Sequence, residues 1–169
     1  WIKPGVPFSA EDTLIDLEGR YVLVKGILDG KYILLGCIYA HNTEQMSFLR
    51  ALCGKLSRWS GCSWLLGGDL LDTMLDRSFP PLSCTTAVSN DKGLIDWLTQ
   101  WQLVDIWRHR HANTKVYSFS VPHNLHIHID RIVGPNDLLL FVSHIDYLDC
   151  TYSDHNPQQL KLVGCWPSP

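Results

Sequence analysis

The sequence predicts an α/β or α+β domain with a layered sheet core, because extended runs alternate with two amphipathic helices. The apolar run at 33–38 is nearly continuous, which is typical of a strand covered on both faces. Asp29-Gly30 precedes this strand and is a strong signal for a tight hairpin. With 169 residues, 46% hydrophobic and 18% charged, the chain has the size and composition of one globular domain over residues 1–169.

The order of elements follows from local periodicity and turn residues. We expect an irregular lead-in over 1–13, because these residues show no clear period. Helical spacing of apolar residues predicts one helix over 43–59, with Asn42 and Gln45 as a capping box, and another over 91–102. Residues 72–90 form a predicted long loop. The predicted strands cover residues 21–28, 31–40, 63–66, 103–107, 116–120, 126–133, 138–145 and 159–163.

Charge and cysteine usage narrow the class of protein. A net charge of -3 gives no overall basic field, although acidic metal ligands in a nuclease can offset a local basic groove. The six cysteines form no Cys-x-x-Cys pair, so we expect free, mostly buried thiols in a reducing compartment, nuclear or cytoplasmic. The sequence shows no apolar run of membrane-spanning length and no signal peptide, so we expect no membrane partner and a monomer.

A polar turn near the C-terminus is the main candidate for chemistry. Asp154 and His155 are adjacent, and Asn156-Pro157 favours a turn over a helix. Asp130 lies in an alternating apolar strand, from which a carboxylate can orient an imidazole. An oriented His beside a second Asp suits general-base work near a metal-bound phosphate. The alternative is that Asp and His are simply common turn residues.

Three further polar sites are open to two interpretations each. Gly67-Gly68-Asp69 ends a short strand, where the glycines either allow a close backbone approach or only make a turn. The basic residues 108–111 fit a solvated loop, which we favour, or the phosphate-facing lip of a groove. His126 and His128 alternate on one strand face, and we expect surface or groove histidines, not a zinc site.

Taken in order, the polar sites resemble the endonuclease/exonuclease/phosphatase superfamily. More narrowly, they are similar to the apurinic-type endonuclease domain of LINE-1-like non-LTR retrotransposons, over roughly residues 15–165. Several spaced motifs in one order are more specific than any single motif. The matching segments are 38–42, 66–69, 105–108, 117–120, 129–132 and 153–157.

The resemblance implies a four-layered α/β sandwich of the DNase I-like type and magnesium-dependent cleavage of DNA, with Mn²⁺ as an alternative ion. It implies that Asp154 contacts the metal, that His155 faces the scissile phosphate, and that Asp130 orients His155. It also implies that Asp69 positions the attacking water. Side chains expected to contact the phosphate or substrate are Tyr39, Ser118 and Ser153.

Two departures from the family pattern predict reduced activity. The family has Phe-Asn after Gly-Gly-Asp, whereas Leu70 and Leu71 stand here, and leucine forms no hydrogen bond through its side chain. The family's first strand-loop unit, which carries an Asn and a metal-ligand Glu, lies before Trp1, and neither Glu11 nor Glu18 sits in a matching motif. We therefore expect a fold incomplete at its N-terminus, with an uncovered apolar face prone to aggregation.

Two other functions compete with the impaired retrotransposon endonuclease. One is a non-catalytic remnant of the fold that at most binds DNA or a protein. The other is a phosphatase or phosphodiesterase of the same superfamily acting on a small molecule or lipid headgroup. The runs at 105–108 and 75–77 favour the retrotransposon branch over the second alternative.

Overall fold

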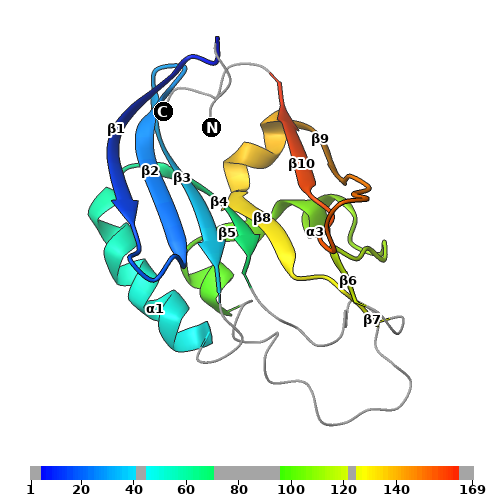
Figure 1. The fold of residues 1–169 in the computed structure, drawn as a ribbon. Coiled ribbons are helices and arrows are strands. Elements are labelled where there is room, and N and C mark those ends of the chain that lie inside the picture. Colours follow the sequence, from blue (N-terminus) through cyan, green and yellow to red (C-terminus); the bar gives the residue numbers. More distant parts are fainter. Residues whose placement is uncertain (1–4, 41–44, 71–95, 122–124, 164–169) are drawn as a thin grey trace.

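The fold is a mixed α/β arrangement around a six-stranded sheet (Figure 1), which confirms the predicted class. The computed structural model describes residues 5–40, 45–70, 96–121 and 125–163. The six strands lie in the order β1-β2-β3-β4-β8-β5. They are β1 (Phe8–Ile15), β2 (Tyr21–Leu28), β3 (Lys31–Tyr39), β4 (Ser63–Asp69), β8 (Asp130–Pro135) and β5 (Leu103–Asp105).

Two smaller sheets and short helices complete the described chain. One small sheet pairs β9 (Val142–Tyr147) with β10 (Gln158–Leu162), and the other pairs β6 (Phe119–Val121) with β7 (Leu125–Ile127). The helices are α1 (Gln45–Leu56), α3 (Ile106–Arg110) and the 3₁₀ turns η1 (Ser57–Trp59) and η2 (Asn136–Phe141), with a further helical stretch over 96–100. Among the described residues, no helix is both long and apolar enough to cross a bilayer.

The hairpin and the first helix form where the sequence predicts them. Asp29 and Gly30 both have positive φ, at 49° and 78°, so β2 returns directly as β3. Helix α1 then crosses over to β4, which lies parallel to β3. The predicted capping residue Asn42 lies outside the described residues, as does the predicted loop over 72–90.

Other expectations need correction. The lead-in is not irregular from Phe8 onward, because β1 pairs with β2, with one register shift between Ala10 and Asp12, and so gains hydrogen bonds that local periodicity does not reveal. The strand predicted over 138–145 begins as the 3₁₀ turn η2 and becomes extended only at Val142. The single strand predicted over 126–133 is two, β7 and β8, separated at His128 and Ile129.

The main core lies between α1 and one face of the six-stranded sheet. Leu49, Leu52 and Leu56 of α1 pack there against sheet residues such as Leu23 and Leu34, and all five are at most 1% exposed. Burial at this level contributes roughly 1.5–3 kcal/mol per large aliphatic side chain. The buried residues of α1 recur every three or four positions and so form one apolar face of the helix. This face packs against one side of the sheet.

Cys53 of α1 belongs to this core. Burial raises the pKa of its thiol to about 11, and Trp97 Nε1 donates a hydrogen bond to Cys53 Sγ at 2.8 Å. A thiol with that pKa is an inert packing group at neutral pH. Among the described cysteines, Cys37, Cys53, Cys62 and Cys150 are free thiols, as predicted. The expectation that they are mostly buried is wrong for these four, because Cys53 is buried, Cys62 and Cys150 are partly buried and Cys37 is exposed.

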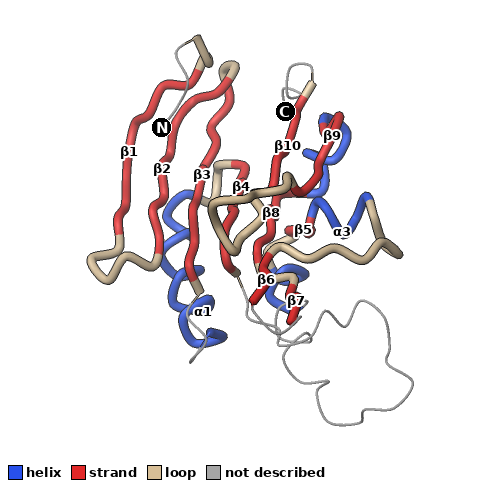
Figure 2. The backbone as a smooth tube through the Cα atoms, turned by 45° about the vertical axis from the view of Figure 1, so that its right-hand side comes forward, coloured by secondary structure: helices blue, strands red, loops and turns tan. Residues whose placement is uncertain are grey.

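The opposite face of the sheet is covered only in part. A second core joins α3, η2 and β9, and Leu65, Ile132, Leu160 and Leu162 pack against it. In Figure 2, β1, β2 and β3 stand side by side, away from β9 and β10. An apolar groove of about 500 Å³ lies on this face. Its lining includes Val22, Val24, Leu35 and Cys37 on one side and Leu160 and Leu162 on the other.

The groove predicts self-association of the isolated chain. Val22→Lys places a charge in the groove, so we expect weaker binding of an apolar dye and less light scattering on heating than for the unchanged chain. Val6→Lys is the matched control, because Val6 is exposed to a similar extent, 45% against 41%, and does not line the groove. A monodisperse, dye-negative chain with a sharp cooperative melt would contradict this prediction.

Candidate active site

Three predicted site residues end or begin neighbouring strands at one edge of the sheet. Tyr39 at the end of β3 is in register with Asp69 at the end of β4, and Asp69 is in register with Asp130 at the start of β8. The Ala40 backbone N–H donates to the Asp69 carbonyl at 2.7 Å, which continues the β3–β4 pairing past the last strand residue. The sheet itself therefore aligns these three residues side by side.

Gly68 makes this alignment sterically possible. Its φ is +128°, and a Cβ added there would lie 2.1 Å from the Ile38 carbonyl oxygen. No side chain fits at that distance, so only glycine lets β4 approach β3 immediately before Asp69. Of the two interpretations of Gly67-Gly68-Asp69, the close backbone approach is the one that this geometry supports.

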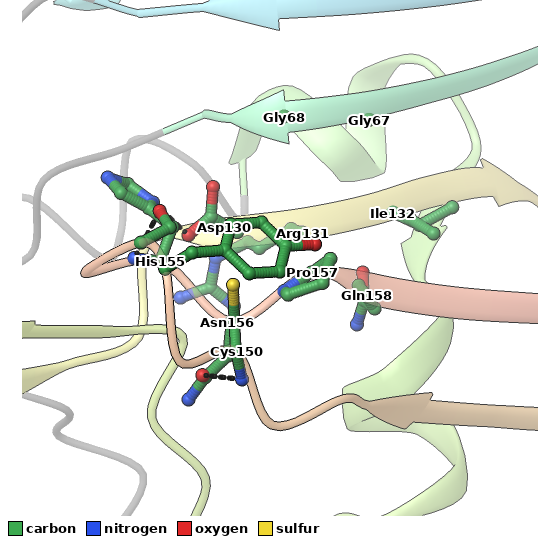
Figure 3. Close-up of a pocket in the computed structure, with 12 residues that line it drawn as sticks. Gly67, Gly68, Asp130, Arg131, Ile132, Cys150, His155, Asn156, Pro157 and Gln158 are labelled. Carbon is green, nitrogen blue, oxygen red and sulfur yellow. Dashed lines mark hydrogen bonds and ion pairs between the residues drawn. The ribbon is translucent and has the colours of Figure 1, made fainter.

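The central interaction joins His155 to Asp130. His155 Nδ1 lies 2.8 Å from Asp130 Oδ2, and the two side chains are 38% and 20% exposed (Figure 3). A carboxylate accepts, so Nδ1 carries the proton of this bond and Nε2 is the nitrogen left for other partners. The His155 ring also contacts the Phe119 ring, with centroids 4.7 Å apart. This contact and the hydrogen bond together fix the orientation of the imidazole.

Backbone hydrogen bonds hold the turn that carries His155 against the segment before β7. Ser120 N donates to the Asp154 carbonyl at 3.0 Å, and Asn156 N donates to the Ser118 carbonyl at 2.7 Å. The Asn156 side chain adds two contacts, because its Oδ1 accepts from Cys150 N and its Nδ2 donates to the Tyr117 carbonyl. The 152–157 turn predicted from the sequence is thus an ordered mount.

Ser153 and Ser118 occupy different environments. Ser153 is exposed, and its Oγ accepts the His155 backbone N–H at 3.0 Å, so it shapes the turn at the surface of the site. Ser118 is fully buried, and its Oγ accepts the backbone N–H groups of Ile129 and Asp130, both at 2.9 Å. A hydroxyl buried in this way does not reach a phosphate from solvent. Ser118 therefore supports the backbone of Asp130 instead of making the predicted phosphate contact.

A pocket of about 440 Å³ opens beside the His155–Asp130 pair (Figure 3). Gly67 and Gly68 of β4 form one wall, and residues 152, 153 and 155–158 form another, so Asp154 does not line the pocket. Arg131 is the one Lys or Arg among the lining residues, and its Nη1 is 2.6 Å from Asp105 Oδ2 in a largely buried ion pair. The pocket therefore presents carboxylate and imidazole groups with little free positive charge.

The donor chemistry at the site suits a hard divalent cation held in part by substrate. Asp154 is exposed on the turn next to His155, and Asp69 and Asp130 are in register with each other on the sheet edge. Within the described ranges, no three His, Cys, Asp or Glu side chains come close enough together to enclose a metal ion. Magnesium commonly takes one or two protein carboxylates and completes its shell with water and phosphate oxygens, and the site fits that mode of binding.

Two groups of basic and histidine side chains depart from their predicted roles. The 108–111 segment is not a solvated loop, because residues 106–110 form α3. Arg108 donates to the Thr114 carbonyl at 2.8 Å, and Arg110 donates to the Val142 and Leu139 carbonyls. His128 is not a surface histidine, since it is 0% exposed and packs against Trp107. Long-range contacts of this kind leave no trace in local sequence patterns.

The Asp105 carboxylate contacts both helix α3 and strand β8. Its Oδ1 accepts the Arg108 backbone N–H at 2.9 Å and caps α3, while its Oδ2 pairs with Arg131 of β8. The three-residue spacing from Asp105 to Arg108 is a recognisable capping signal. The pairing with Arg131, 26 positions along the chain, has no such local signal.

The architecture is an α/β fold of the DNase I-like type, as the comparison with solved structures shows. No protein-family model matches the sequence. Among solved structures, the chain is similar to the AP endonuclease LMAP from Leishmania major, with a TM-score of 0.71 and 20% identity over 86% of this chain. It is also similar to an AP endonuclease from Archaeoglobus fulgidus, with a TM-score of 0.68 and 16% identity over 92% of this chain.

A third similar structure contains nucleic acid. It is the 3′ phosphatase NExo (D146N) from Neisseria bound to product DNA hairpin, with a TM-score of 0.65 and 14% identity over 93% of this chain. The chain spans 55% of the length of the Leishmania protein and 72% of each of the other two. These similarities establish the fold.

The environment of Ser118 predicts a stability effect. Ser118→Ala leaves the buried N–H of Ile129 and the partly buried N–H of Asp130 without their acceptor, so we expect the free energy of unfolding to fall by about 2–4 kcal/mol. Urea denaturation followed by tryptophan fluorescence measures this change. The control is Ser143→Ala, because the Ser143 hydroxyl makes an exposed bond to the Lys161 carbonyl and should contribute less than about 0.5 kcal/mol. Equal stability of the two variants would argue against the supporting role.

Proposed function

We propose that this chain is a magnesium-dependent phosphodiesterase domain acting on DNA, of the LINE-1-like retrotransposon endonuclease type, with reduced activity in residues 1–169. The observation that carries the proposal is the His155–Asp130 hydrogen bond, mounted beside Asp69 at one sheet edge. The similar solved structures include AP endonucleases and a 3′ phosphatase with DNA, which supports the substrate class. The sequence segments at 105–108 and 75–77 support the retrotransposon type.

In the proposed reaction His155 faces the scissile phosphate. Its Nδ1 donates to Asp130, which leaves Nε2 to exchange a proton or hydrogen bond with the phosphate or the attacking water. Asp130 fixes the tautomer and stabilises the imidazolium when His155 is protonated. Because both side chains are partly buried, the electrostatic attraction between His155 and Asp130 is stronger than it would be in open water.

Electrostatics explain why the proposal includes a cation. Asp69, Asp130 and Asp154 repel an incoming phosphate, and Arg131 in the pocket is already paired with Asp105. A phosphate approaches these carboxylates only when an added positive charge offsets them. Asp154 is the residue proposed to hold Mg²⁺, with Mn²⁺ as the alternative. When bound, the ion neutralises charge that develops on the phosphate oxygens.

The remaining side chains are assigned by position. Asp69 is proposed to position the attacking water, since it lies next to Asp130 in the sheet register. Tyr39 is 48% exposed at the end of β3 and is proposed to contact the phosphate, as is the exposed Ser153. Ser118 holds Asp130 from behind. In-line attack needs these groups to be fixed before substrate arrives, and a sheet edge provides that rigidity.

The leading alternative is a non-catalytic remnant of the same fold. Leu71 replaces an amide side chain in the resemblance. This replacement weakens catalysis while leaving the fold intact. In this alternative the site residues are the same, but the chain does not cleave DNA.

Plasmid nicking tests the reduced activity. For residues 1–169 with Mg²⁺, we expect no conversion of supercoiled plasmid above that of the His155→Ala control, because the nucleophile lacks its positioning amide. Gel electrophoresis of time points measures nicked product. Nicking by the unchanged chain that disappears in His155→Ala would show that the site is already complete. In that event Asp69→Ala and Asp154→Ala should abolish nicking too, and activity retained in either would remove that residue's assigned role.

An amide side chain at position 71 distinguishes the impaired endonuclease from the non-catalytic remnant. Leu71→Asn returns a hydrogen-bonding side chain after Gly-Gly-Asp-Leu, and we expect nicking to rise at least about tenfold above the His155→Ala background, the equivalent of one hydrogen bond in the transition state. The activity should vanish in the double variant with His155→Ala. An inactive Leu71→Asn chain that melts like the unchanged chain would favour the non-catalytic remnant.

A further inference from the structure

A partly buried series of hydrogen bonds, centred on the fully buried His128, runs from α3 to the backbone of Asp130. Arg108 Nη2 lies 3.3 Å from His128 Nδ1, and His128 Nε2 lies 2.7 Å from the Tyr147 hydroxyl. The Tyr147 hydroxyl donates to the Asp130 carbonyl oxygen at 2.6 Å. The series thus connects α3, the segment before β8, and β9 to the residue that orients His155.

The direction of each bond in this series is fixed by chemistry. A carbonyl only accepts, so the one hydroxyl proton of Tyr147 goes to Asp130. The hydroxyl oxygen then accepts from His128, which places the His128 proton on Nε2. A guanidinium only donates, so Arg108 requires an unprotonated Nδ1. His128 is therefore neutral and in the Nε2–H tautomer.

The surroundings keep this series of hydrogen bonds intact at neutral pH. His128 is fully buried, and the Trp107 ring contacts the rings of both His128 and Tyr147, with centroids 5.8 and 5.7 Å away. Burial raises the pKa of the Tyr147 hydroxyl far above its usual range. Tyr147 therefore stays protonated and remains a donor to Asp130.

From this geometry we propose that Tyr147, oriented by His128 and Arg108, is a positioning residue for Asp130 and hence for His155. Asp130 is the first residue of β8, and the two residues before it lie outside any strand. Its backbone N–H is held by Ser118 and its carbonyl by Tyr147. With both ends of the residue held, its carboxylate meets His155 in one orientation. The inference rests on the roles proposed above for Asp130 and His155.

The His155 Nδ1–H proton reports on this positioning, because its NMR resonance moves downfield when the bond to Asp130 is short and ordered. In Tyr147→Phe the carbonyl of Asp130 loses its donor. We expect the His155 Nδ1–H resonance to shift upfield and its exchange with solvent to quicken at least threefold. Tyr32→Phe is the matched control, since Tyr32 is 50% exposed and does not line the pocket. A folded Tyr147→Phe chain with an unchanged His155 resonance overturns the proposal.

His128 variants give a second, independent test. His128→Gln keeps an N–H donor toward Tyr147 and a carbonyl acceptor for Arg108, so the His155 resonance should keep its position. His128→Leu removes both contacts and should reproduce the change seen in Tyr147→Phe. A merely structural role predicts instead that both variants lower the melting temperature and leave the His155 resonance in place. An Nδ1–H tautomer of His128 in the unchanged chain also overturns the proposal, whether or not the variants fold.

These measurements need no turnover, which separates this inference from the proposed function. A shifted His155 resonance in Tyr147→Phe, together with a folded Leu71→Asn chain that does not nick DNA, would support the positioning role and count against the nuclease. Nicking that depends on His155, together with an unchanged resonance in Tyr147→Phe, would support the nuclease and remove the positioning role.

Discussion

The candidate site depends on one residue, Asp130, whose backbone and side chain are both held by hydrogen bonds. Its carboxylate accepts a hydrogen bond from His155, its N–H donates one to Ser118, and its carbonyl accepts one from Tyr147. These partners come from the loop after β9, the segment before β7, and β9 itself. Removing one partner of such a partly buried hydrogen bond costs more stability than the intact bond contributes, because the remaining polar group is left unsatisfied. The position of His155 therefore follows from interactions that reach across the fold.

The sheet supplies the other half of the geometry. Gly68 lets β4 lie against β3 without a side chain between them, and the register then places Asp69 between Tyr39 and Asp130. This alignment needs no side-chain hydrogen bond, since it comes from backbone pairing alone. A site built on strand ends in this way is more rigid than one built on loops. The Asn156 side-chain contacts hold the loop that carries Asp154 and His155 against this edge of the sheet.

Local patterns predicted the parts of the molecule that local forces decide. The Asp29-Gly30 hairpin, helix α1 and the Asp154-His155 turn all form where turn chemistry and helical spacing placed them, and the predicted partnership of Asp130 and His155 is present. Strand β1, the buried Ser118 and the buried His128 were predicted differently. Each is determined by a contact with another segment of the chain: β2 for the first, residues 129–130 for the second, and Tyr147 for the third. No periodicity encodes such partners.

The uneven covering of the sheet explains why the site relies on polar contacts. Helix α1 buries one face over β2, β3 and β4, whereas β9 and β10 reach only as far as β4 and β8 on the other. The pocket beside His155 and the apolar groove meet at Gly67 and Ile132, along the line where that cover ends. Apolar burial therefore cannot fix the site on its open side. The hydrogen bonds from Tyr147 and Ser118 do so instead, because directional bonds hold an orientation that a half-covered apolar surface leaves free.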